Sequence, residues 1–187
     1  MNYLLFLKSG VGFVRKLFAR WKVARESKRV RIFRKRLQRL DWRPIAYRLK
    51  LLGWSRQEVT EALMQYTIFL LGTYLHPNCR LVPTRRIDVV WHCHLEDTLK
   101  YSQDCQVLFG RFIHHFPYFG LRGEADRQDL EDAFAKTRDL LLPYLGDDVL
   151  ENAEPSDCEL LRNPNQLRPG EDVDINAMLQ DLLEPWM

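Results

Sequence analysis

Cysteine is scarce in this sequence, and its placement fits neither a disulfide framework nor a structural zinc site. The chain of 187 residues has four cysteines and no C-x-x-C pair: Cys79, Cys93, Cys105 and Cys158. We interpret them as reduced thiols of a cytosolic protein. No H-E-x-x-H motif is present, which excludes that zinc-protease pattern. The chain also lacks 18 consecutive apolar residues, so no membrane-spanning helix is expected.

Signals for β-structure are equally rare. No segment alternates apolar and polar residues for long enough to predict a sheet. Helical signals are frequent instead: Ser55 and Glu58 form the sequence of a capping box, and the helix that they open is predicted to run to about Leu75. A last core helix is predicted over 124–142, ended by Pro143. The sequence therefore predicts an all-α fold, a compact and helical bundle-like domain.

Acidic residues are almost missing from the first part of the chain. Residues 1–50 contain 16 Lys and Arg against two acids, whereas the rest of the chain contains 12 basic and 23 acidic residues. Such a charge asymmetry indicates segments with different partners. We predict a basic amphipathic helical arm over 1–39, a helical core domain over 40–145, and an acidic tail with a short terminal helix over 146–187.

Apolar residues recur in the arm at spacings of three and four, with cations beside them. This pattern is typical of a helix with one apolar side. Two interpretations are open. The arm lies on an anionic membrane surface, which makes the protein cytoplasmic and peripheral to the membrane, or it packs on the body of the protein or on a protein partner. The residues of this surface are Leu4, Leu7, Val11, Val14, Phe18, Trp21, Lys8, Arg15 and Lys22.

The basic residues of 15–39 allow a third interpretation, in which the arm neutralises the phosphates of RNA. Arg31, Arg34 and Arg36 are the central candidates. No recognisable RNA- or DNA-binding module accompanies them. A solvated basic face therefore remains the simpler hypothesis for this segment.

The chain concentrates its histidines in two clusters, WHCHLED at 91–97 and HH at 114–115. Thr84 suits the cap of a helix over 85–95. On a helix, the side chains of His92 and His94 point about 200° apart, because each residue turns by about 100°. Both rings therefore cannot hold one ion there, and we expect them to have separate roles.

His92 follows Asp88 by four residues, so the two side chains are expected to be in contact. If the helix continues, the side of the helix that carries His94 also carries three more polar or sulfur-containing residues, Tyr101, Asp104 and Cys105. We expect such a seam to be a buried hydrogen-bond network that fixes how helices meet.

Two chemical alternatives stay open beside that structural network. A metal site would take His94, Asp97, His114 and His115 as ligands, a set that suits Zn or Fe. A catalytic site would use His92 with Asp88 as an acid–base pair, or Cys105 as a nucleophile. No motif in the sequence decides among these hypotheses.

The stretch LVPTRRIDVVWHCHLEDTLKYSQDCQVLFGRFIHHFPYFG resembles the signature block of the glycine-rich domain-containing protein-like family. The resemblance extends from about Leu40 to Tyr144. Plant members of that family carry glycine-rich and RNA-binding segments, whereas this chain has nine glycines and no such extension. The resemblance implies that these residues form one unit, and it implies no activity. The residues that carry it are Asp88, Trp91, His92, His94, Tyr101, Asp104, Cys105, Phe109, Gly110, His114 and His115.

Taken together, these patterns favour a non-enzymatic, cytoplasmic binding or adaptor-type protein whose polar seam is structural. A metal-dependent enzyme and an RNA-associated protein are the alternatives. Each predicts a different use of the same residues.

Overall fold

The structure is a computed structural model that describes residues 27–146, 149 and 153–156. Within these residues the chain forms six helices and no strand, with one isolated β-bridge between Thr84 and Pro155. The all-α prediction is confirmed. None of the described helices is both long and apolar enough to cross a membrane. The helices are α3 (Lys28–Leu37), α4 (Arg43–Leu51), α5 (Arg56–Leu75), α6 (Arg85–Glu96), α7 (Thr98–Phe109) and α8 (Glu124–Leu145).

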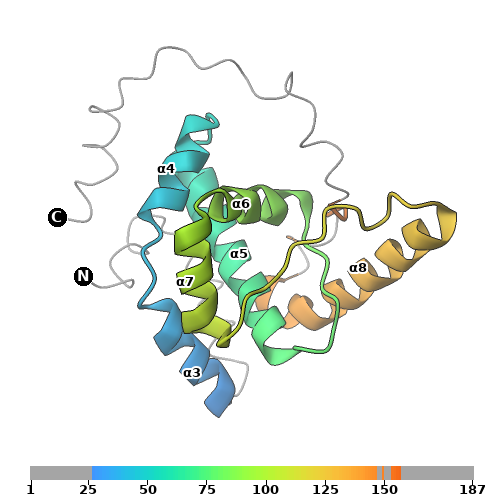
Figure 1. The fold of residues 1–187 in the computed structure, drawn as a ribbon, viewed down its shortest axis with the longest axis horizontal. Coiled ribbons are helices and arrows are strands. Elements are labelled where there is room, and N and C mark those ends of the chain that lie inside the picture. The colour runs from blue at the N-terminus through green and yellow to red at the C-terminus, as the bar shows by residue number, and fades with distance from the viewer. Residues whose placement is uncertain (1–26, 147–148, 150–152, 157–187) are drawn as a thin grey trace.

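Helix α5 is the centre of the fold: α3, α4, α6 and α8 pack against it, and α7 packs against α3 and α6 (Figure 1). Every residue from Ala62 to Gly72 is buried, as expected for a helix that is apolar on all sides. The predicted capping box is present: the Ser55 hydroxyl accepts from the Glu58 amide, and the Glu58 carboxylate accepts from the Ser55 amide. The first and last residues of this helix therefore agree with the prediction from the sequence.

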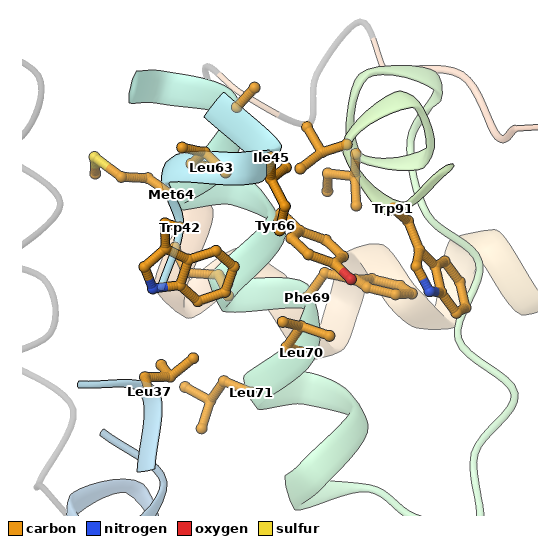
Figure 2. Packing of buried hydrophobic residues seen from close by; sticks show 14 of the residues in the cluster. Leu37, Trp42, Ile45, Leu63, Met64, Tyr66, Phe69, Leu70, Leu71 and Trp91 are labelled. Atoms are coloured by element: carbon orange, nitrogen blue, oxygen red, sulfur yellow. The ribbon is translucent and has the colours of Figure 1, made fainter. Parts of the chain in front are cut away.

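Large aromatic side chains fill the core on both sides of α5. Figure 2 shows Tyr66 and Phe69 between Trp42 on one side and Trp91 on the other. Trp42 meets Tyr66 edge-on at 6.3 Å between ring centroids, and Phe69 lies 5.4 Å from Trp91. Burial of such rings supplies much of the hydrophobic driving force for folding.

Helix α3 belongs to this core, although its residues fall inside the predicted basic arm. Val30, Phe33 and Leu37 are buried against the neighbouring helices α5 and α7, and Figure 2 places Leu37 beside Leu71. Arg36 donates to the carbonyl oxygen of Leu108 at 2.7 Å. The folded body of the protein therefore starts at least as early as Lys28, before the predicted boundary at residue 40.

The predicted helix over 85–95 is confirmed as α6, capped by the Thr84 hydroxyl. It does not continue into α7. Asp97 ends α6 and caps α7, because its carboxylate accepts from the amide of Lys100 at 3.1 Å. The chain changes direction at this residue, so α7 packs against α6 instead of extending it.

Helix α8 runs to Leu145 and passes Pro143, where the sequence predicted its end. A proline in the last turn removes a single backbone donor, and the buried Leu141 and Leu145 hold that turn in the core. Gly72 of α5 lets α8 approach closely, because a Cβ there would lie 2.6 Å from the Leu141 side chain.

Two predictions fall on residues that the structure does not describe. The apolar and basic residues of the arm, from Leu4 to Lys22, lie outside the described residues, as does the short terminal helix of the tail. Cys79, Cys93 and Cys105 are free thiols, as expected, and Cys158 lies outside the described part of the chain.

Candidate functional site

His92 and His94 have different partners, as the helical geometry of α6 requires. His92 lies near Asp88 and His115, whereas His94 lies between Tyr66 and Asp104. The predicted separation of the two rings is confirmed. The histidines therefore belong to two sites, one at the surface and one in the core.

The surface site is formed by Asp88, His92 and His115, each of which offers one ligand atom, with all three atoms within 4.8 Å of one another. Nε2 of His115 lies 3.0 Å from Oδ1 of Asp88, and Nε2 of His92 lies 3.5 Å from Oδ2. The two imidazole rings meet edge to face at 4.7 Å. Among the described residues, this is the only group of three such side chains placed closely enough to hold a metal ion.

The protonation states at this site suit a cation. Burial raises the pKa of Asp88, but the hydrogen bonds from His115 and Ser156 outweigh it, and the net pKa is lowered. Asp88 is therefore a carboxylate at neutral pH although it is fully buried. Burial lowers the pKa of His92, against the opposing effect of Asp88, so its ring is neutral and has a lone pair to offer.

Two aromatic side chains, Trp91 and Tyr101, fix the position of His115, which lies in the segment after α7. The Trp91 indole donates to the Tyr101 hydroxyl at 3.0 Å, and this hydroxyl donates to the carbonyl oxygen of Ile113 at 2.6 Å. Trp91 also packs edge-on against the His115 ring, at 4.7 Å. Figure 1 shows the segment crossing from α7 to the beginning of α6, where Asp88 lies. The aromatic core therefore brings His115 into contact with Asp88, although the two residues are 27 positions apart in the sequence.

The beginning of the acidic tail completes the surroundings of Asp88. The Ser156 hydroxyl donates to Oδ2 of Asp88 at 2.7 Å, and the Ser156 amide donates to the carbonyl oxygen of Pro83 at 3.0 Å. Pro155 forms the isolated bridge with Thr84. Sequence analysis missed Ser156, because no periodicity or motif connects the tail with residue 88.

The ion pair between Glu154 and Arg85, at 3.1 Å, adds a second attachment of the tail to α6. Both side chains are at least half exposed, so this pair contributes little to stability. The attachment depends instead on the buried hydroxyl of Ser156.

The core site is a chain of hydrogen bonds around His94. Nε2 of His94 lies 3.0 Å from Oδ2 of Asp104, and Nδ1 lies 3.0 Å from the Tyr66 hydroxyl. A carboxylate only accepts, so Nε2 carries the proton and the Tyr66 hydroxyl donates to Nδ1. Lys100 also donates to Asp104, at 2.6 Å. Both nitrogens of His94 are therefore used inside the protein.

Burial lowers the pKa of His94, although the hydrogen bond to Asp104 works in the opposite direction. The pKa of the Tyr66 hydroxyl is raised well above its ordinary value, mainly by burial. Neither group ionises near neutral pH. This chain of hydrogen bonds contains His94 and Asp104 of the predicted seam, together with Tyr66 and Lys100, which the sequence did not reveal. Tyr101 bonds instead to Trp91 and to the carbonyl oxygen of Ile113.

The predicted metal ligands do not form a group of the kind that Asp88, His92 and His115 form in the described part of the chain. His94 has no free ring nitrogen for an ion, and Asp97 is an exposed helix cap. His114 is exposed, and its ring is tilted against that of Phe112 at 4.9 Å, while its neighbour His115 contacts Asp88. The rings of Tyr101 and Phe112 stand in the series of contacts between His94 and His114, with centroids 4.9, 5.2 and 4.9 Å apart in turn.

Cys105 was a candidate nucleophile. It is buried in the core, and burial raises its pKa. A buried thiol of this kind is mostly protonated and inaccessible, which is the state opposite to that of a reactive cysteine. The candidate acid–base pair, His92 and Asp88, is in the predicted contact at 3.5 Å.

No protein-family model, curated protein or solved structure matches this chain. The family resemblance of the histidine-bearing block therefore stays a prediction.

The surface site combines one carboxylate oxygen and two imidazole nitrogens. Asp88 and His92 lie one turn apart on α6, and His115 comes from the segment after α7. Such a set can hold a divalent transition-metal ion, or it can pass a proton between His115 and Asp88. The neutral ring of His92 and the buried, ionised Asp88 suit the first use directly.

Proposed function

We propose that this protein binds a divalent transition-metal ion, Zn²⁺ or Fe²⁺, through Asp88, His92 and His115. The observation that carries the proposal is the convergence of these three ligand atoms within 4.8 Å of one another. Two imidazole nitrogens with one carboxylate oxygen form a ligand set that both metals accept. Mg²⁺ and Ca²⁺ prefer oxygen ligands alone and fit less well.

The three ligand atoms would move somewhat closer together to receive an ion. Ligands at about 2.1 Å from a tetrahedral zinc ion lie about 3.4 Å from one another. The contacts of Asp88, at 3.0 Å to His115 and 3.5 Å to His92, join the two rings to different oxygens of the carboxylate, and the three ligand atoms lie within 4.8 Å of one another. We expect rotation of the side chains to turn both rings toward one carboxylate oxygen when an ion binds.

To bind an ion through Nε2, His115 would carry its proton on Nδ1, which leaves a lone pair on Nε2. Metal ligands must be deprotonated, so binding weakens at low pH. Ser156 keeps its hydrogen bond to the second carboxylate oxygen and orients Asp88, in the manner of outer-shell partners in metal sites. The His94 network plays no part in binding and serves as scaffold in this proposal.

The test is the metal content and affinity of the purified full chain. We expect about one equivalent of Zn²⁺ or Fe²⁺ after reconstitution, and an affinity loss of at least tenfold to a hundredfold in His115→Ala and in His92→Ala. His114→Ala is the matched control, because its ring is the sequence neighbour of His115 but exposed. It should bind metal like the natural chain.

Two outcomes contradict the proposal. One is a chain that takes up no stoichiometric metal, measured by mass spectrometry after dialysis. The other is a loss of metal in Asp97→Ala or His114→Ala with normal binding in His115→Ala, which would favour the ligand set predicted from the sequence.

A further inference from the structure

Apart from Arg34, the basic residues of α3 and of the turn after it form two groups with different surroundings. Arg29 donates to the carbonyl oxygen of Tyr74 at 2.9 Å, and Arg36 donates to that of Leu108 at 2.7 Å. Both guanidinium groups also lie over the Tyr74 ring. These two arginines therefore attach α3 to the body of the protein.

The second group faces away from the body: Lys28, Arg31, Lys35 and Arg39, called here the outer cations. Lys28, Arg31 and Lys35 lie within about 60° of one another around the helix. Arg39 lies in the turn that follows α3. The buried side chains Val30, Phe33 and Leu37 lie on the opposite side. All four outer cations are exposed, and among the described residues none of them forms an ion pair or a side-chain hydrogen bond.

Local stability does not explain this arrangement. Like charges three and four residues apart on a helix repel each other, and a face that only needs solubility alternates acids with bases. Lys28 also lies at the positive end of the helix dipole, where a cation is unfavourable. The first turn of α3 contains no acid. A row of like charges that begins at the positive end of its helix, with no acid in the first turn, indicates an anionic partner.

We propose that the outer cations of α3 form a docking face for an anionic membrane surface. This inference is independent of the metal site and goes beyond it. From Lys28 to Lys35 the row spans about 10 Å at 1.5 Å per residue, and Arg39 follows it in the next turn, so the row is long enough to contact more than one lipid headgroup. The body of the protein holds α3 with this face outward, since Arg29, Arg36 and the buried residues fix the rotation of the helix.

The sequence before α3 favours lipid over nucleic acid as the partner. From Leu4 to Lys22 it carries leucine, valine and aromatic residues at sequence spacings of three and four, with cations beside them. Aliphatic side chains gain nothing from a nucleic-acid backbone, whereas they insert into the boundary between headgroups and acyl chains. The docking face then continues a membrane-binding pattern that starts earlier in the chain.

The experiment measures binding of the full chain to vesicles of 70% phosphatidylcholine and 30% phosphatidylserine. In the variant K28Q/R31Q/K35Q/R39Q we expect an affinity loss of at least 50-fold, because each cation near an anionic surface contributes about a fivefold gain. The matched control R111Q/R127Q/K136Q/R138Q removes the same charge from other exposed positions. It should lose less than about fivefold.

Folding and salt dependence complete the test. The outer-cation variant should unfold at the same or a higher urea concentration than the natural chain, since like-charge repulsion is removed. Binding of the natural chain should fall steeply between 0.05 and 0.5 M NaCl, as expected from screening over about 4 to 14 Å. Equal vesicle binding in both quadruple variants would overturn the proposal, and so would tight RNA binding by a chain that ignores the vesicles.

Discussion

His92 and His94 lie two residues apart on α6 and contact two different carboxylates. Nε2 of His92 is 3.5 Å from Asp88, in the same helix, and Nε2 of His94 is 3.0 Å from Asp104, in the next helix. One ring is half-buried at the surface, and the other is 1% exposed in the core. A single short motif thus serves a candidate metal site on one side of the helix and a structural network on the other.

Removal of the Tyr66 hydroxyl should destabilise the protein. In Tyr66→Phe, Nδ1 of the buried His94 loses its donor, and an unsatisfied buried polar atom costs about 1 to 3 kcal/mol. Urea unfolding at pH 7.5, in the presence of EDTA, measures the change in free energy. Tyr47→Phe, at a half-buried position, is the control and should change stability by less than about 0.5 kcal/mol. Equal stability of both variants would remove the structural role of this hydrogen bond.

Ser156→Ala should weaken metal binding without removing it, provided that the proposed metal site is correct. The substitution deletes the donor to Oδ2 of Asp88 but leaves all three ligands. We expect an affinity loss of about tenfold, as for other outer-shell partners. Competition with a chromogenic chelator gives the dissociation constant. Ser102→Ala, at an exposed position, is the control, and an identical affinity in the two variants would contradict a positioning role for Ser156.

Asp126 should titrate in the acid range. Its carboxylate accepts from the Arg122 side chain and from the amides of Arg122 and Gly120, which lowers its pKa to about 2. A carboxyl group with a lowered folded-state pKa stabilises the fold above its ordinary value of 3.8 and loses this contribution as the pH falls toward 2. NMR titration of the carboxyl carbon should show this value.

Asp126→Asn should in turn make the stability of the protein depend less on pH between 4 and 2. A carboxyl carbon of Asp126 that titrates near 3.8 in the natural chain would show that these hydrogen bonds do not persist in solution.

The two core thiols should be unreactive in the folded protein. Burial raises the pKa of Cys93 to about 11 and also raises that of Cys105. In a Cys79→Ser, Cys158→Ser chain at pH 8, we expect a disulfide reagent to modify the native thiols at least 100-fold more slowly than the urea-unfolded thiols. Rapid modification of Cys105 in the native state would revive its role as a nucleophile.

The sequence by itself determined the helices and the separation of His92 from His94. The capping box at Ser55 and Glu58, the cap at Thr84 and the contact between Asp88 and His92 all depend on residues close in sequence. Side chains three or four residues apart on a helix meet whatever the rest of the chain does. Such features can therefore be predicted from local patterns.

Only the tertiary structure decided which distant groups complete each site. The change of direction at Asp97 brings Asp104 to His94, and the segment after α7 brings His115 to Asp88. Ser156 arrives from a tail that is 68 residues away from its partner in sequence. The packing of large side chains such as Trp91 and Tyr101 determines which of these distant groups come into contact. The core is close-packed, so the shapes and hydrogen bonds of these side chains restrict how the helices fit together.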